Sequence, residues 1–266
     1  MQDSPLAVGH IHEPPGAAEP AEVFPLLADP RGYRCNTWNL LAEPEKLTYW
    51  IALFRQHLRT MRAHALADAE ALDGDVTNAS RRFDEVVRDF DAYLDAVADQ
   101  PDRFGSPGVM EICLARENVL RRHGFDDPYR LAKAQQNEAA LPLLRPLLEE
   151  LDSLTGRALA ERIVRGVFAG NIFDLGATRT NDLFIEGGVD FHATLGRLVP
   201  RPWRIDDLDA WLERVETGRP HRRALVFVDN AGCDIVLGMI PFVRWLLERG
   251  TGVIVAANTY PTPTLR

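Results

Sequence analysis

Residues 223–257 read RALVFVDNAGCDIVLGMIPFVRWLLERGTGVIVAA, and this stretch decides the fold class. Arg223–Val228 is rich in Val, Leu and Phe and predicts a buried strand, and Gly252–Ala257 predicts a second one. Met239–Glu248, between them, has the apolar spacing of a helix. Strand, helix and strand in so short a stretch are typical of a parallel crossover unit. We therefore predict a parallel α/β sheet in the last third of the chain.

Polar side chains follow both predicted strands. Asp229 and Asn230 come directly after the first strand, and Asn258 follows the second. Ligands of open parallel sheets bind beyond the carboxyl ends of the strands. Carboxylate and amide oxygens suit Mg²⁺ or Mn²⁺, and Asp234 at the start of the next helix adds a third polar group. Asx residues also make ordinary turn hydrogen bonds, so a metal site and a plain turn both remain open.

The composition excludes some classes of partner. The chain has 266 residues, 46% hydrophobic and 26% charged, which is enough for one large domain or two smaller ones. A net charge of -9 argues against nucleic acid, although local Arg clusters can still bind a small anion. The three cysteines form no metal or disulfide pattern, and no signal peptide or membrane-spanning run is evident. We expect a cytoplasmic protein without nucleic-acid or membrane partners.

The chain divides into three predicted parts. Residues 1–32 are rich in Pro, Ala and Glu and predict an extended or disordered arm. Residues 33–165 predict a mostly helical subdomain, and residues 166–266 a partial α/β domain. The helical part carries an apolar stripe at spacings of three and four, which predicts a core separate from the sheet. Its expected members are Trp50, Phe54, Leu58, Phe83, Phe90 and Leu94.

The helix boundaries are marked by turn residues. Gly74 is expected to end the first long helix, and Asn78 or Ser80 to cap the second. Pro128 is expected to open a later helix.

Two further stretches place polar residues in apolar surroundings. Phe168–Ala177, FAGNIFDLGA, contains Asn171 and Asp174. Either these polar side chains are buried and need partners, as in a polar site, or Gly170 and Asn171 simply form the C-cap that ends a helix.

Arg116 and its neighbour Glu117 lie on an otherwise apolar helix. They predict either a structural ion pair or an arginine that grips an anion. A nucleotide-binding loop ending in Lys-Ser/Thr and a Gly-x-Ser-x-Gly elbow are both missing from the sequence.

Four motifs occur in the order of a known family. They are RENVLRRHGFDDPY (116–129), KAQQNEAALPLL (133–144), GVFAGNIFDLGA (166–177) and FVDNAGCDIVLGMIPFVRWLLERGTGVIVAAN (227–258). With these motifs the chain, from about Tyr33 to Asn258, resembles the metal-dependent damage-control phosphatases, once catalogued as a domain of unknown function. It is most similar to the branch that is fused to pantothenate kinases and acts on 4'-phosphopantetheine and its damaged forms.

The resemblance implies a fold and a reaction. The fold is α/β, with a helical N-terminal part docked on a three-layer α/β/α Rossmann-like parallel sheet. The reaction is hydrolysis of a phosphate monoester of a small metabolite, with a divalent cation (Mn, Ni, Co or Mg) held by Asp229, Asn230 and a further aspartate. The expected catalytic residues are Asp229, Asn230 and Asn171, and the expected substrate contacts are Arg116, Asp174 and Asp234.

The third expected metal ligand departs from the family pattern. In the family it closes a stretch of the form Asn-Ser-x-Pro-Ala-Leu-Asn-Asp. Asn258, Thr259 and Pro261 keep the start of that stretch, but Leu265 occupies the aspartate position, and a later Glu-Gly-Met-Gly-Arg motif is absent. This pattern predicts a sheet left incomplete by a truncation or a shifted frame, with weak metal binding and little turnover. A non-catalytic remnant that binds a ligand or partner is the alternative.

Overall fold

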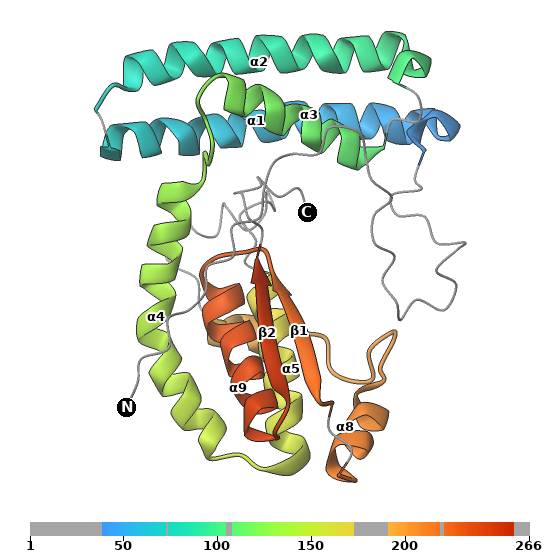
Figure 1. The fold of residues 1–266 in the computed structure, drawn as a ribbon, viewed down its shortest axis with the longest axis vertical. Helices are drawn as coiled ribbons and strands as arrows, with labels where there is room; N and C mark the ends of the chain where they lie inside the picture. The colour runs from blue at the N-terminus through green and yellow to red at the C-terminus, as the bar shows by residue number, and fades with distance from the viewer. Residues whose placement is uncertain (1–38, 73, 105–107, 173–190, 219–220, 258–266) are drawn as a thin grey trace, which may run out of the picture. The chain divides into compact units, whose positions relative to one another are not determined.

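The computed structural model describes residues 39–72, 74–104, 108–172, 191–218 and 221–257, all within one compact unit, Asn39–Arg266 (Figure 1). The elements in chain order are η1 (Leu40–Ala42), α1 (Pro44–Leu72), α2 (Val76–Asp99), η2 (Pro101–Phe104), α3 (Val109–Arg122), α4 (Arg130–Asp152), α5 (Gly156–Asn171), α7 (Phe191–Arg197), α8 (Leu208–Glu216), β1 (Arg223–Val228), the π-helical segment η3 (Asp234–Met239), α9 (Ile240–Glu248) and β2 (Gly252–Ala257).

Helices α1, α2 and α3 pack around an aromatic core. The ring centroids of Phe54 and Phe90 lie 6.1 Å apart, and those of Phe83 and Phe125 lie 5.1 Å apart, both edge to face. Such pairs add to the free energy gained by burying the rings. The predicted helical core is confirmed, and its members are Phe54, Leu58, Phe83, Phe90 and Leu94, all buried, with Trp50 packed against them.

The start of α2 differs from the prediction. Asp75, not Asn78 or Ser80, is the N-cap residue, and its side-chain oxygen accepts a hydrogen bond from the backbone N–H of Asn78 at 2.9 Å. A carboxylate one turn earlier satisfies a free N–H of the first helical turn and complements the helix dipole, so it displaces the expected caps. Gly74, with φ +71°, lies two residues after the last residue of α1, Leu72, and its backbone N–H donates to the carbonyl oxygen of Ala69 at 3.1 Å, as expected of a glycine that ends a helix.

Strands β1 and β2 form the predicted parallel pair, with Arg223 opposite Gly252 and Val228 opposite Ala257. Both strands have the predicted bounds, and the connection between them contains η3 and α9 (Figure 1). The predicted helix Met239–Glu248 corresponds to α9, which begins at Ile240, and the π-helical segment η3 precedes it from Asp234. The α/β class with a helical N-terminal part is confirmed, while the three-layer sheet stays a prediction.

The expectation of a fully buried first strand is wrong for the described residues. Val226 is buried, but Leu225 is 49% and Phe227 is 71% exposed. On β2, Ile254 is 57% exposed. Alternate strand residues face opposite sides of a sheet, so one face packs on helices while the other is left open by the part of the chain that the structure describes.

A second core lies beside the sheet, and it draws on α4, α5, α7, α8, η3 and α9. Its buried members include Leu147, Ile163, Leu212, Leu237 and Trp245. The short helices α7 and α8 were not predicted from sequence. The boundaries of the three predicted parts stay predictions, and residues 1–32 lie outside the described residues.

Candidate functional site

Asp229 and Asn230 lie directly beyond the carboxyl end of β1, as predicted. Because Val228 is paired with Ala257, both strands end at the same level, and the loop from Asp229 to Gly232 sits at that edge. The side chain of Asp229 is exposed and that of Asn230 is partly buried. A carboxylate and an amide are thus presented together at the edge where parallel sheets bind ligands.

Helix α4 holds this loop in place through a hydrogen bond and a close backbone contact. The backbone N–H of Gly232 donates to Oδ1 of Asn137 at 2.7 Å. Gly232 has φ +67°, and a Cβ there would lie 2.8 Å from the Cβ of Gln136. Only glycine fits this position without strain, because the backbone is left-handed and α4 is in direct contact with it.

Helix α5 reaches the same loop through glycines. A Cβ on Gly170 would lie 2.9 Å from both the Cα of Asp234 and the carbonyl oxygen of Cys233. A Cβ on Gly238 would lie 3.3 Å from the carbonyl oxygen of Gly166. We call this contact between α5 and η3, made by Gly166, Gly170 and Gly238, the glycine seam. It places the end of α5 against the first residues of η3.

The seam brings Asn171 next to the loop. Asn171 is the last residue of α5 and is exposed, and its neighbour Gly170 touches Asp234. The association of Asn171 with Asp229 and Asn230 stays a prediction, and α5 ends at Asn171, as its capping alternative expected. Asp174, Asn258 and Leu265 lie outside the described residues.

Asp234 starts η3 and is buried, with 4% of its surface exposed. Burial, together with the negative charge of Asp234, raises the pKa of Cys233 to about 11. The thiol is therefore protonated at neutral pH, and we assign it no nucleophilic role. π-Helical turns are often found at functional sites, and this one begins with Asp234, the third polar group that the sequence analysis named.

Arg116 lies in the helical bundle, where 1% of its surface is exposed. Its Nη1 donates to Nδ1 of His57 at 3.2 Å, and its guanidinium lies 5.5 Å from the ring centroid of Phe54. Glu117 instead pairs with Arg121, one helical turn away, at 3.0 Å. A role for Arg116 in substrate binding stays a prediction.

The tautomer of His57 follows from its partners. An arginine can only donate, so Nδ1 of His57 accepts, and Nε2 carries the proton toward the Tyr129 hydroxyl at 3.5 Å. Burial lowers the pKa of His57 to about 4, assisted by the positive charge of Arg116 and by His64. His57 is therefore neutral at physiological pH, which lets a cationic side chain stay buried beside it.

The loop carries two side chains whose oxygen atoms could bind a hard cation such as Mg²⁺ or Mn²⁺. Asp229 supplies a carboxylate and Asn230 an amide, and Nδ2 of Asn230 is buried without a hydrogen-bond partner among the described residues. Amide oxygen and nitrogen are assigned from their surroundings, so either orientation leaves one polar atom of Asn230 available. Within the described ranges, no three His, Cys, Asp or Glu side chains cluster closely enough to hold a metal ion. Two oxygen ligands with open positions still fit Mg²⁺ or Mn²⁺, which keep several waters.

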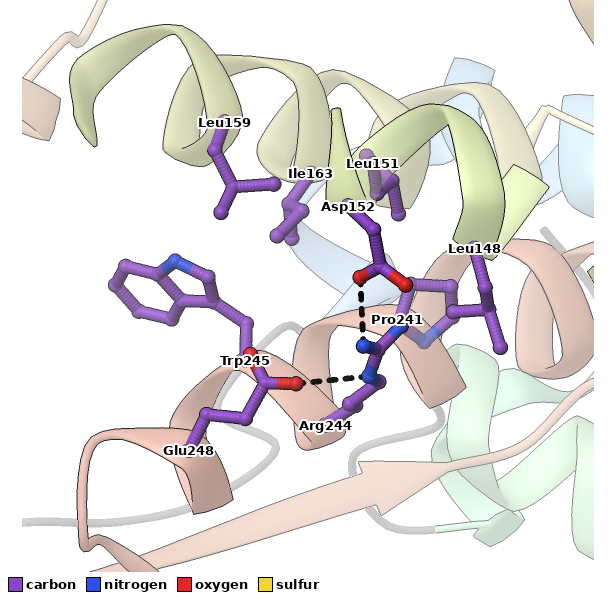
Figure 2. Close-up of a pocket in the computed structure, with 9 residues that line it drawn as sticks. All are labelled: Leu148, Leu151, Asp152, Leu159, Ile163, Pro241, Arg244, Trp245 and Glu248. Carbon is purple, nitrogen blue, oxygen red and sulfur yellow. Dashed lines mark hydrogen bonds and ion pairs between the residues drawn. The ribbon is translucent and has the colours of Figure 1, made fainter. Parts of the chain in front are cut away.

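A small pocket elsewhere is not part of this site. It lies between the end of α4, the start of α5 and α9 (Figure 2). There Arg244 donates to Asp152 at 2.6 Å and to Glu248 at 2.8 Å, beside apolar side chains such as Ile163 and Trp245. The pocket reaches to Glu248, at the end of α9 remote from η3, so it lies away from the carboxyl ends of the strands.

Two residues of the loop's surroundings were missed by sequence reasoning. Gln136 and Asn137 belong to the motif KAQQNEAALPLL, but their sequence position gave no reason to place them at a strand end. The only local signal is a pair of amide side chains on a helix, with Gln136 on its buried face.

The fold and the loop define an α/β protein with an aspartate and an asparagine directly beyond the end of a parallel strand. The family described as "Damage-control phosphatase ARMT1-like domain" matches residues 52–264. The match covers most of the 266 residues, and the chain belongs to this family.

Curated relatives span several branches of the family. The chain is 39% identical over 264 residues to "Pantothenate kinase 2" of Arabidopsis thaliana, which covers 97% of this chain and 28% of that protein. It is 35% identical over 240 residues to "4'-phosphopantetheine phosphatase" of Mus musculus, covering 90% and 28%. It is 36% identical over 225 residues to a damage-control phosphatase of Arabidopsis thaliana, covering 83% and 59%. The chain thus spans less than two thirds of the length of each of these relatives.

Across the described residues, no helix combines the length and the apolar character needed to cross a membrane.

Proposed function

We propose that this chain contributes the cation-binding part of a metal-dependent phosphomonoesterase that acts on a small phosphorylated metabolite. The observation that carries the proposal is the loop after β1, where Asp229 and Asn230 are held beyond a parallel strand by the hydrogen bond from Gly232 to Asn137. Membership of a phosphatase family supports the reaction class.

The charges around the loop explain why a cation is needed. Asp229 and Asp234 are acidic, and the whole chain carries a net charge of -9. A phosphate monoester is itself an anion, so these carboxylates would repel it. A bound divalent cation supplies the charge that neutralises the phosphoryl oxygens and polarises the phosphorus centre.

The residues of this chain then have separate roles. Asp229 provides the charged ligand and Asn230 a neutral one, while Asn137 keeps both in place through the loop backbone. Asn171 and Asp234 are the proposed contacts of the phosphate or its attacking water, with Arg116 and Asp174 as further proposed substrate contacts.

The proposed substrate is 4'-phosphopantetheine or a damaged derivative of it. The support is the 35% identity to a mouse protein named 4'-phosphopantetheine phosphatase. A non-catalytic protein that binds such a ligand is the alternative, and the experiment below separates the two.

The test combines calorimetry with a phosphate-release assay. We expect Mn²⁺ to bind the wild-type chain weakly, as two protein oxygen ligands imply, Asp229→Ala to remove this binding, and Asn230→Ala to weaken it less, because water can replace a neutral oxygen. Asp99→Ala, which alters an exposed carboxylate at the end of α2, is the control and should bind as the wild type does. Mn²⁺ binding that survives Asp229→Ala would falsify the site.

Phosphate release from 4'-phosphopantetheine with Mn²⁺, Co²⁺ or Ni²⁺ then tests the reaction. Turnover that Asp229→Ala abolishes supports the phosphatase. Metal binding without turnover by the wild-type chain supports the binding protein instead.

A further inference from the structure

The side-chain nitrogen of Gln136 is buried and has no hydrogen-bond partner in the part of the chain that the structure describes. The side chain of Gln136 is 7% exposed, and its Nε2 makes no hydrogen bond with any described residue. Burying such a group without a partner costs free energy, so an unsatisfied buried amide in a folded protein calls for an explanation.

The position of this amide links it to the strand-end loop. The Cβ of Gln136 lies against Gly232, and its Oε1 would be 3.3 Å from a Cβ at that position. The next residue, Asn137, uses its own amide to hold the same loop. On the loop itself, Nδ2 of Asn230 is a second buried amide nitrogen without a partner among the described residues. Helix α4 and the loop that it contacts thus each carry a buried amide nitrogen without a partner among the described residues.

We propose that Gln136 is a substrate-binding residue whose amide N–H donates to a phosphoryl oxygen of the ligand held at Asp229 and Asn230. This inference rests on the proposed function and adds a ligand contact from α4 that the sequence did not indicate. The amide N–H needs an acceptor, and a phosphate has several anionic oxygens around its phosphorus, more than a cation alone can occupy.

A neutral donor suits this location better than a cationic one. A lysine or arginine at position 136 would repel the divalent cation across the short distance to the loop, and in a buried setting that repulsion is weakly screened. An amide binds an anionic oxygen without this conflict. This hydrogen bond involves only the phosphoryl group. Gln136 therefore contributes to phosphate binding and does not distinguish one phosphorylated metabolite from another.

The test compares three variants of the full chain in the presence of saturating Mn²⁺. Gln136→Met keeps the volume and removes the donor, and Gln136→Glu keeps the shape and replaces the donor by an anionic acceptor. Gln135→Met changes the adjacent glutamine, which is exposed, and serves as the matched control. Calorimetry measures the affinity for Mn²⁺ and then for inorganic phosphate, and circular dichroism follows thermal unfolding.

We expect Gln136→Met to bind inorganic phosphate about 10-fold more weakly, the loss that follows from removing one hydrogen bond to a charged group. Gln136→Glu should lose more, because it adds repulsion. Gln136→Met should keep the Mn²⁺ affinity of the wild type, and Gln135→Met should match the wild type in every measurement. If Gln136→Met does not fold, Gln136→Glu, which has the native shape, gives the answer.

Unchanged phosphate affinity in Gln136→Met overturns the inference. Absence of phosphate binding by the Mn²⁺-loaded wild-type chain also overturns it. Failure of the wild type to bind Mn²⁺ is a different result, because it counts against the cation site of the proposed function as well.

Discussion

The two cores of this chain are packed in opposite ways. In the bundle of α1, α2 and α3 the helices are kept apart by large rings, such as Phe54 and Phe90. In the glycine seam, α5 and η3 touch through backbone atoms, because Gly170 and Gly238 have no side chains to separate them. A core filled by side chains loses contacts when a ring is removed, whereas a seam made of backbone tolerates no added atom.

The difference also bears on function. The bundle could repack around a smaller side chain without moving the strand-end loop. The seam cannot, because its contact with Gly170 involves Cys233 and Asp234, which are two of the residues that follow the loop. We therefore expect substitutions in the bundle to change stability, and substitutions in the seam to change stability and ligand binding together.

The largest loss of stability is expected for a substitution in the bundle of α1, α2 and α3. Phe90→Ala should lower the free energy of unfolding by about 3–5 kcal/mol, because the ring is fully buried and a cavity remains. Urea unfolding measures this loss, and Phe90→Leu, which keeps much of the volume, should lose clearly less. Mn²⁺ affinity of the folded variant should stay at the wild-type value. A loss below about 1 kcal/mol would show that the ring is not part of a tightly packed core.

A pH titration sharpens the same comparison at a polar position of the bundle. The pKa of His57 is about 4 in the folded chain and 6.5 when unperturbed, so the unfolded state binds the proton more readily. Its contribution to stability is complete above pH 6.5 and is lost as the pH falls toward 4, by up to about 3 kcal/mol.

His57→Gln is the matched variant for this titration. Its amide oxygen can still accept from Arg116 but does not titrate in this range. Unfolding midpoints in urea between pH 7 and pH 4.5 should fall less steeply for His57→Gln than for the wild type. His64, whose pKa burial also lowers, should leave part of the slope in place. Equal slopes for the two chains would rule out a buried neutral His57.

A substitution in the glycine seam should lower the free energy of unfolding by less than Phe90→Ala does, and it should also weaken Mn²⁺ binding. Gly170→Ala places a methyl group 2.9 Å from two backbone atoms and should cost about 1–3 kcal/mol through overpacking. Its Mn²⁺ affinity should also fall, because η3 must shift. Gly196→Ala in α7 is the control, since a Cβ there meets no atom within 4 Å, and it should be neutral or slightly stabilising. If Gly170→Ala kept full affinity, the seam would not position the loop.

The sequence predicted the parts of the fold that local patterns determine. The apolar stripe around Phe54 and Phe90 and the bounds of β1 and β2 follow from helical and strand periodicity, and the structure confirms them. The cap of α2 was placed too late because several capping residues compete over one turn. The exposure of Phe227 could not be predicted, since strand composition does not reveal which elements cover each face.

Only part of the candidate site could be predicted from the sequence. Asp229 and Asn230 were predicted because polar residues at a strand end are a local pattern. Asn137 and Gln136 reach the loop from a helix 95 residues earlier in the chain, and no periodicity encodes such a contact. The role of Gly170 was equally hidden, because glycine near a helix end reads as a stop signal until its neighbour in space is known.

The hydrogen bond from Gly232 to Asn137 has a consequence for the order of folding. Most contacts within α1, α2 and α3 join helices that are neighbours in the sequence, so we expect closing them to cost less chain entropy and these contacts to form earlier. The hydrogen bond between α4 and the loop joins residues that are 95 positions apart in the sequence. Bringing them together costs more chain entropy, so this bond stabilises the chain only after that cost has been met. During synthesis the bundle emerges before the strands do, so the chain acquires a folded region well before it acquires a place to bind a ligand.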